Sequence, residues 1–260
     1  MFKSYRLGSL FGFPVEINVS FLILLGVVFL AFGGLAGVLF TAIAFGSVLL
    51  HELGHALVAR ALRVRVSGIE LGFLGGAAKM VDMPRTPNHE IAIAAAGPAV
   101  SLALGGVGLG LGALLASPFV ATIGWINLVL AGFNLIPALP MDGGRILRAA
   151  LAKKMSFVRA TDISVQVARV VAVLFGVWAI AGGPFQLLIL APFLWFMGTR
   201  EQVMARMVEE HLGHGGYPGS GPLAGDGVEV LGRGAWENRA RPRRYTITQV
   251  GGRLVITAYD

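Results

Sequence analysis

The chain has 260 residues, of which 55% are hydrophobic and only 13% are charged, and its formal net charge is +7. Soluble domains average about 25% charged residues, so this composition excludes an ordinary soluble protein and indicates a membrane protein. Because the chain contains no cysteine, disulfides, thiolate-bound zinc and a thiol nucleophile are excluded. Any bound metal must therefore be held by histidine and carboxylate side chains.

Six apolar segments approach the length of about 20 residues that a helix needs to cross a bilayer. The predicted spans are residues 17–32, 35–60, 91–116, 119–139, 163–182 and 184–197. We therefore expect an all-α polytopic membrane protein with six transmembrane helices in residues 1–210, the first and last of them short. The third span is rich in glycine, which favours close helix packing in lipid.

The basic residues predict the orientation of these spans. Apart from Arg169 near the start of the fifth span, lysines and arginines lie before the first span and after the second, fourth and sixth. In a six-span protein these regions share one side, which the positive-inside rule makes cytoplasmic. No signal-peptide cleavage pattern precedes the first span. We expect a multi-pass protein of a bacterial or archaeal plasma membrane with both termini cytoplasmic, and no nucleic-acid partner.

The second span carries the pentapeptide His51-Glu52-Leu53-Gly54-His55 near its end. Helix positions i and i+4 share one face, so the two imidazoles can hold one metal ion, and Glu52 can reach a water on that ion. Ionisable groups inside a span are costly and by default functional, although a chance match is the alternative. Since His55 is five residues before Arg60, the site is expected inside the bilayer, nearer its cytoplasmic face.

Residues 64–80 predict a small β element at the membrane. Ile69, Leu71 and Phe73 alternate with other residues, and several glycines interrupt the stretch, which is typical of short strands with turns. Such backbone survives near a membrane only when it is buried in protein or lines a wet cavity. An ordinary surface hairpin is one interpretation. The other is a strand edge that binds an unwound substrate by β-augmentation.

The fourth span ends in a proline-containing stretch that starts at Asn134 and continues to Asp142-Gly143-Gly144. Pro137 and Pro140 break the helix, and the freed backbone lets Asp142 turn inward. A solvated turn at a helix end is the alternative, since such turns use the same residues.

A catalytic zinc site typically has three protein ligands and one open position. His51 and His55 supply two, and Asp142 is the other membrane-embedded acid that can complete the set. Glu52 would then act as general base. Asn134 would donate its amide to the developing oxyanion, or else serve helix packing.

The composition changes after Glu210. Residues 211–227 are a Gly/Pro-rich linker, and residues 228–260 predict a small β-rich cytoplasmic tail. Its strands are expected at 228–231, 245–250 and 254–259, the last two joined as a hairpin at Gly251-Gly252.

The HELGH pentapeptide together with the Asn134-x-x-Pro-x-x-Pro-x-Asp-Gly stretch resembles the site-2 protease family of intramembrane zinc metalloproteases. The similarity covers about residues 8–205 and is greatest to the compact six-helix members that include the sporulation factor protease. It implies one Zn2+ per chain held by His51, His55 and Asp142, with Glu52 as catalytic base and Asn134 near the substrate carbonyl. Ser101 departs from the asparagine common in the family's G-P-x-x-N motif.

The resemblance also implies the reaction. Such enzymes cut a single-span membrane-anchored regulatory protein within or next to its transmembrane segment. Two other functions use the same residues, namely a zinc transporter and an inactive relative that only binds substrates. The transporter would need polar groups toward the outer side, and the first and last spans contain almost none.

Overall fold

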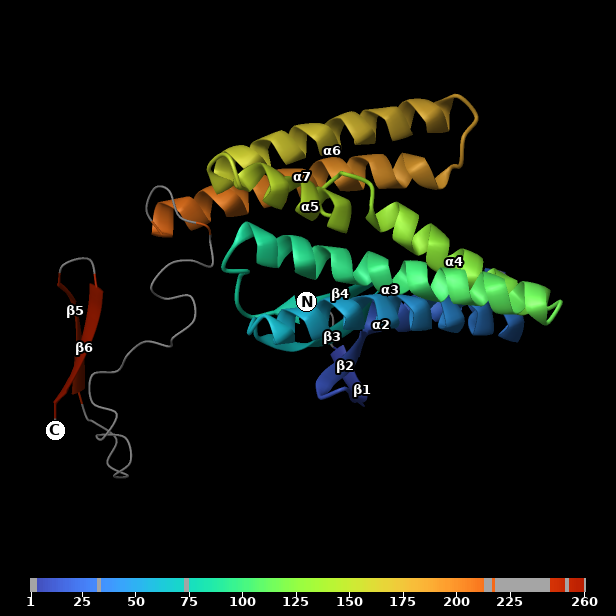
Figure 1. Cartoon of the computed structure of the whole chain (residues 1–260), viewed down its shortest axis with the longest axis horizontal. Helices are drawn as coiled ribbons and strands as arrows, with labels where there is room; N and C mark the ends of the chain where they lie inside the picture. Colours follow the sequence, from blue (N-terminus) through green and yellow to red (C-terminus); the bar gives the residue numbers. More distant parts are fainter. Residues whose placement is uncertain are drawn as a thin grey trace. The chain divides into compact units, whose positions relative to one another are not determined.

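The structure is a computed structural model that describes residues 4–31, 34–72, 75–212, 217, 244–250 and 253–259. It contains two compact units, Met1–Gly221 and Pro222–Asp260. In the described part of the first unit the helices are α1 (Val19–Ala31), α2 (Leu35–Ala61), α3 (Pro87–Leu114), α4 (Pro118–Asn134), α5 (Asp142–Ala152), α6 (Phe157–Ile180) and α7 (Gln186–Leu212). Figure 1 shows α6 and α7 side by side, with the short α5 between this pair and α3.

Three of the described helices are long and apolar enough to cross a membrane, namely Gly37–Ala61, Pro87–Leu114 and Phe157–Ile180. Val19–Leu30 and Pro118–Asn134 are apolar but shorter. The segment predicted at 184–197 belongs to α7, which continues as a charged helix to Leu212. The structure is thus that of a mostly helical membrane protein. That six helices span the membrane stays a prediction.

The chain between α4 and α6 differs from the prediction. The fourth span was expected to reach residue 139, but α4 ends at Asn134 because the proline-containing stretch cannot continue a helix. A further helix that was not predicted, α5, then begins at Asp142. Its first turn packs directly on the preceding backbone. A Cβ at Gly143 would lie 2.2 Å from the carbonyl oxygen of Leu135, so glycine is needed there.

Four strands form one sheet in the order β1-β2-β3-β4. The strands are β1 (Ser4–Leu10), β2 (Phe13–Asn18), β3 (Val66–Gly72) and β4 (Gly75–Met80). β1–β2 and β3–β4 are antiparallel, whereas β2 and β3 pair in parallel with α1 and α2 between them in sequence. The predicted strands within 64–80 are present, and β1 and β2 were not predicted.

The sheet packs on the end of α2 that carries the HELGH pentapeptide. Phe13 from β2 and Ile69 from β3 form a buried cluster with Leu53 and Ala56 of α2. Burial of these side chains, worth about 1.5–3 kcal/mol for each large one, fixes the sheet against the helix. The sheet therefore lies beside the candidate site.

Small residues bring α3 and α4 into close contact, as predicted for the glycine-rich third span. A Cβ at Gly108 would lie 2.7 Å from the Cα of Gly124, and one at Gly112 would lie 2.8 Å from the Cα of Ala121. Such close approach of backbones is the usual way that helices associate in lipid.

The second unit, in its described part, is a two-stranded antiparallel sheet of β5 (Arg244–Val250) and β6 (Arg253–Tyr259). These strands match the predicted hairpin strands. The strand predicted at 228–231 and most of the linker predicted at 211–227 lie outside the described residues.

Candidate metal centre

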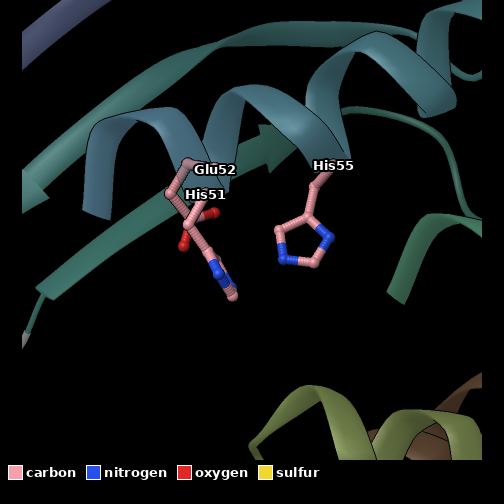
Figure 2. Close-up of side chains that lie close together, drawn as sticks. All are labelled: His51, Glu52 and His55. Carbon is pink, nitrogen blue, oxygen red and sulfur yellow. The ribbon is translucent and has the colours of Figure 1, made fainter. Parts of the chain in front are cut away.

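His51 and His55 lie on one face of α2, because residues four apart on a helix are neighbours. Both are buried, with 2% and 3% of their surface exposed. Their ring centroids are 4.9 Å apart, and the planes meet edge to face. Figure 2 shows both rings projecting from the same side of the helix, with Glu52 beside His51.

A neighbouring helix, α3, orients both rings. His55 Nδ1 is 2.6 Å from the carbonyl oxygen of Ile93, and His51 Nδ1 is 2.9 Å from Ser101 Oγ. A carbonyl only accepts, so Nδ1 of His55 donates the proton and the neutral ring keeps a lone pair on Nε2. Hydrogen bonds of this kind fix the ring orientation and tautomer of metal-binding histidines.

Asp142 meets both histidines from the first residue of α5. Its Oδ2 lies 3.1 Å from Nε2 of His51 and 3.1 Å from Nε2 of His55. A carboxylate oxygen that faces the lone pair of a neutral imidazole is repelled unless a proton or cation lies between them. The structure thus brings together three groups that are far apart in sequence, in an arrangement that a cation would stabilise.

Gly97 leaves room for these groups on α3. A Cβ at this position would lie 2.2 Å from His55 Nε2 and 2.6 Å from His51 Nε2. Any side chain would therefore occupy the space between the two nitrogens. With its two histidines, a carboxylate and a glycine beside them, the site fits a zinc ion, which prefers nitrogen and oxygen ligands in a compact tetrahedral set.

Glu52 reaches the site from the neighbouring face of α2. Its carboxylate and the two imidazoles have ligand atoms within 4.8 Å of one another. Its Oε2 also accepts a hydrogen bond of 3.0 Å from the backbone N–H of Ala78 in β4. The sheet thus holds this carboxylate through one of its two oxygens.

Asn134 lies at the end of α4, eight residues before Asp142. Its amide nitrogen donates to the carbonyl oxygen of Leu130, 2.9 Å away in the same helix. This bond is local to α4, so the predicted catalytic role of Asn134 stays a prediction.

Sequence reasoning missed the groups that hold the site. The carbonyl of Ile93 and the amide of Ala78 are backbone atoms without a sequence signal. Ser101 and Gly97 were noticed as small residues of the third span, Ser101 also as a departure from the G-P-x-x-N motif and Gly97 as the first residue of that motif. Ile93, Gly97 and Ser101 follow one another at intervals of four residues and therefore lie on one helix face. This spacing was the available signal.

Known proteins are similar to this chain over much of its length. The model of peptidase family M50 matches residues 39–122 and 111–175. A zinc metalloprotease of Methanocaldococcus jannaschii is 35% identical over 215 residues, 79% of this chain and 62% of that protein. Stage IV sporulation protein FB of Bacillus subtilis is 27% identical over 143 residues, 54% of this chain and 50% of that protein. The chain thus spans less than two thirds of the length of these relatives.

The solved structure of a site-2 protease from Methanocaldococcus jannaschii has the same fold. It superposes with a TM-score of 0.61 and 33% identity, over 77% of this chain and 95% of that one. The chain belongs to peptidase family M50, the site-2 protease family. The relative in Methanocaldococcus jannaschii is named a zinc metalloprotease, and His51, Glu52 and His55 of this chain form a group that could hold a metal ion.

Proposed function

We propose that this protein is an intramembrane zinc endopeptidase. It would hydrolyse a peptide bond within or next to the transmembrane segment of a single-span, membrane-anchored regulatory protein. The observation that carries the proposal is the 3.1 Å approach of one Asp142 oxygen to both imidazole nitrogens, with Glu52 alongside. Family membership and the named zinc metalloprotease relative support it.

In this proposal His51, His55 and Asp142 hold one Zn2+, which when bound supplies the Lewis acidity that activates water and polarises a peptide carbonyl. Glu52 accepts the proton of the attacking water on its free oxygen and delivers it to the leaving amine. The bond from Ala78 keeps that carboxylate from rotating away. Asn134 donates to the developing oxyanion after releasing its bond to Leu130.

The substrate must be unwound before it can be cut, because a helical carbonyl is engaged in the backbone ladder. β4 is one of the two edge strands of the sheet. On one side of an edge strand, no neighbouring strand pairs with the backbone groups. We place the extended substrate along this edge, beside the zinc ligands. Ala78 turns its N–H outward to Glu52, so Met80, two residues on, presents its N–H on the same side.

The edge interaction is tested by Met80→Pro, which removes one outward N–H. Met80→Ala is the control, since it changes the side chain and keeps the N–H. In zinc-loaded protein we expect cleavage of a single-span substrate to fall several-fold with proline and to change little with alanine. Equal activities of the two variants would refute substrate pairing at this position.

The catalytic role of Glu52 is tested by Glu52→Gln in the purified protein. We expect zinc content to be retained and cleavage to fall by about a hundredfold or more, as expected on loss of a general base. Glu209→Gln on α7 is the control, with unchanged activity. Zinc flux in proteoliposomes should be absent for the wild type and for Glu52→Gln. Cleavage by zinc-free protein, or zinc transport, would contradict the proposal.

The proposal extends to topology and domains. Residues 1–210 form the six-span catalytic unit in a plasma membrane, with both termini cytoplasmic and the site nearer the cytoplasmic face. Residues 211–227 form a linker, and residues 228–260 a cytoplasmic tail. The clustering of basic residues supports this orientation.

A further inference from the structure

Asp142 reaches the histidines from a short helix. α5 has 11 residues and lies between α3 and the α6–α7 pair (Figure 1). Its first turn packs on the backbone of the preceding segment. The position of the Asp142 carboxylate therefore depends on what holds the rest of α5 against α3, the helix that orients both imidazoles.

Arg148, six residues after Asp142, makes that connection. Its guanidinium contacts Glu90 Oε1 of α3 through Nη2 and through Nε, the latter at 3.2 Å. Its Nη1 lies 2.8 Å from Glu201 Oε2 of α7. The side chains of Arg148 and Glu90 are only 11% and 3% exposed, and the other Glu90 oxygen accepts from the Tyr217 hydroxyl. One buried cation thus joins three helices.

Glu90 lies one helical turn before Ile93, whose carbonyl receives the proton of His55 Nδ1. The contact that holds α5 and the contact that orients His55 are therefore adjacent on one face of α3. Any movement of α5 along α3 would shift Asp142 relative to both imidazoles.

On one side α5 borders a cavity. Arg145 and Arg148 of α5 line a cavity of about 520 Å³, together with Glu90 and Glu201. The ion pair of Arg148 with Glu90 joins α5 to α3 at the wall of this cavity. A buried ion pair is also poor evidence of net stabilisation, because desolvating the charges offsets much of their attraction. The ion pair matters here because it fixes the position of α5 along α3.

We propose that Arg148 is a positioning residue. By binding Glu90 it fixes α5 against α3, so that the Asp142 carboxylate stays within reach of both histidines. This inference rests on the proposed role of Asp142 as the third zinc ligand.

The test measures the metal site without relying on catalysis. The variants are Arg148→Met, Arg148→Lys, Glu90→Gln and Glu201→Gln, with Asp142→Ala as reference. Arg206→Met is the matched control, because Arg206 forms a more exposed ion pair, 3.6 Å long, between α7 and Asp162 of α6. For each full-length protein we would measure the zinc Kd by chelator competition, the visible spectrum of the Co2+-loaded form and thermal unfolding without metal.

We expect the zinc Kd to rise about tenfold to a hundredfold in Arg148→Met and Glu90→Gln, with an altered Co2+ spectrum, as is usual when a group that orients a ligand is lost. Arg148→Lys keeps the positive charge, so its zinc Kd should rise less. Glu201→Gln should change little, since Glu201 is 36% exposed and its ion pair with Arg148 joins α5 to α7 rather than to α3. Arg206→Met should match the wild type.

The outcomes separate the two ideas. If Asp142→Ala itself leaves the zinc Kd unchanged, the proposed ligand assignment fails. If Asp142→Ala weakens zinc binding but folded Glu90→Gln binds zinc with wild-type Kd and Co2+ spectrum, the positioning role is refuted. A lower unfolding temperature with an unchanged metal site would likewise mean that Arg148, Glu90 and Glu201 serve stability alone. Should Arg148→Met fail to fold, Glu90→Gln decides the question.

Discussion

The histidines, Glu52 and Asp142 depend on groups from other elements for their orientation. Ser101 and the Ile93 carbonyl set the two imidazoles, and the amide of Ala78 sets Glu52. The departure of Ser101 from the family motif is thereby explained in part. A serine hydroxyl at this position is short enough to reach Nδ1 of His51 across the narrow gap that Gly97 leaves between α2 and α3.

Gly97→Ala should abolish zinc binding. The added methyl group would lie 2.2 Å from His55 Nε2, closer than any non-bonded contact allows, and would displace the imidazoles. Gly106→Ala on the same helix is the control, because nothing lies within 4 Å of its Cβ. Both changes favour helix formation by about 1 kcal/mol, so a loss of folding is not the expected cause. Zinc content of the purified variants checks the prediction, and normal zinc content in Gly97→Ala would contradict it.

At this scale the sequence predicted what local spacing encodes. His51, Glu52 and His55 follow from the i, i+4 geometry of one helix. Bringing Asp142 close to them needed the assumption that no other membrane acid was available. The backbone donors and acceptors around the site depend on tertiary packing, which spacing does not encode.

Among the elements, the sheet has a charged cluster that joins its strands. Glu16 of β2 and Glu70 of β3 are paired in register, where like charges repel. Lys79 of β4 lies between them, 3.0 Å from Glu16 Oε2 and 2.5 Å from Glu70 Oε2. The hydrogen bond with Lys79 lowers the pKa of Glu70, and the bond with Glu70 raises the pKa of Lys79.

Lys79→Met should lower the stability of the sheet at neutral pH by about 1 kcal/mol, near the upper limit for a partly exposed ion pair. Because the pKa of Glu70 is lowered by folding, its contribution is present above its unfolded pKa and is lost as the pH falls through the folded value. The raised pKa of Lys79 keeps its contribution below about pH 10 and loses it above. The effect of the substitution should therefore be greatest between about pH 5 and 10.

Hydrogen exchange of β2 and β3 amides at neutral and acidic pH measures this effect. Lys154→Met, at an exposed position after α5, is the control. A loss of protection that is the same at pH 7 and below about pH 3 would contradict the sign of the linkage.

Three elements, β1, β2 and α5, escaped sequence reasoning. In β2, Phe13, Val15 and Ile17 alternate with Pro14, Glu16 and Asn18, so a strand signal was present, but the first span was predicted to begin within it at residue 17. α5 had no clear signal, because Pro137 and Pro140 mark the end of α4 and an Asp-Gly-Gly sequence is typical of a turn. Asp142 at a helix N-terminus is nevertheless favourable for the helix dipole.

For the whole molecule, composition and charge predicted the membrane class and the orientation, whereas the number of spans depends on the shorter helices. The lack of cysteine makes topology directly testable by single-cysteine labelling. Lys154→Cys should react with a membrane-impermeant maleimide only from the cytoplasmic side, and Ser117→Cys only from the outside. Opposite sides follow if α3 and α4 both cross the bilayer. Labelling of both positions from the same side would refute the six-span arrangement.

The parallel pairing of β2 with β3 also imposes an order of assembly. Val15 pairs with Ile69, and the chain between them contains both α1 and α2. Parallel neighbours require a connection that returns to the starting edge, so α1 must lead away from the sheet and α2 must come back to it. During synthesis the β1–β2 hairpin consequently lacks its partner strand β3 until both apolar helices have left the ribosome and the chain has returned to the sheet. β4, the strand that holds Glu52, follows both helices in the chain, so the Glu52 carboxylate gains its Ala78 partner only after α1 and α2 have been made.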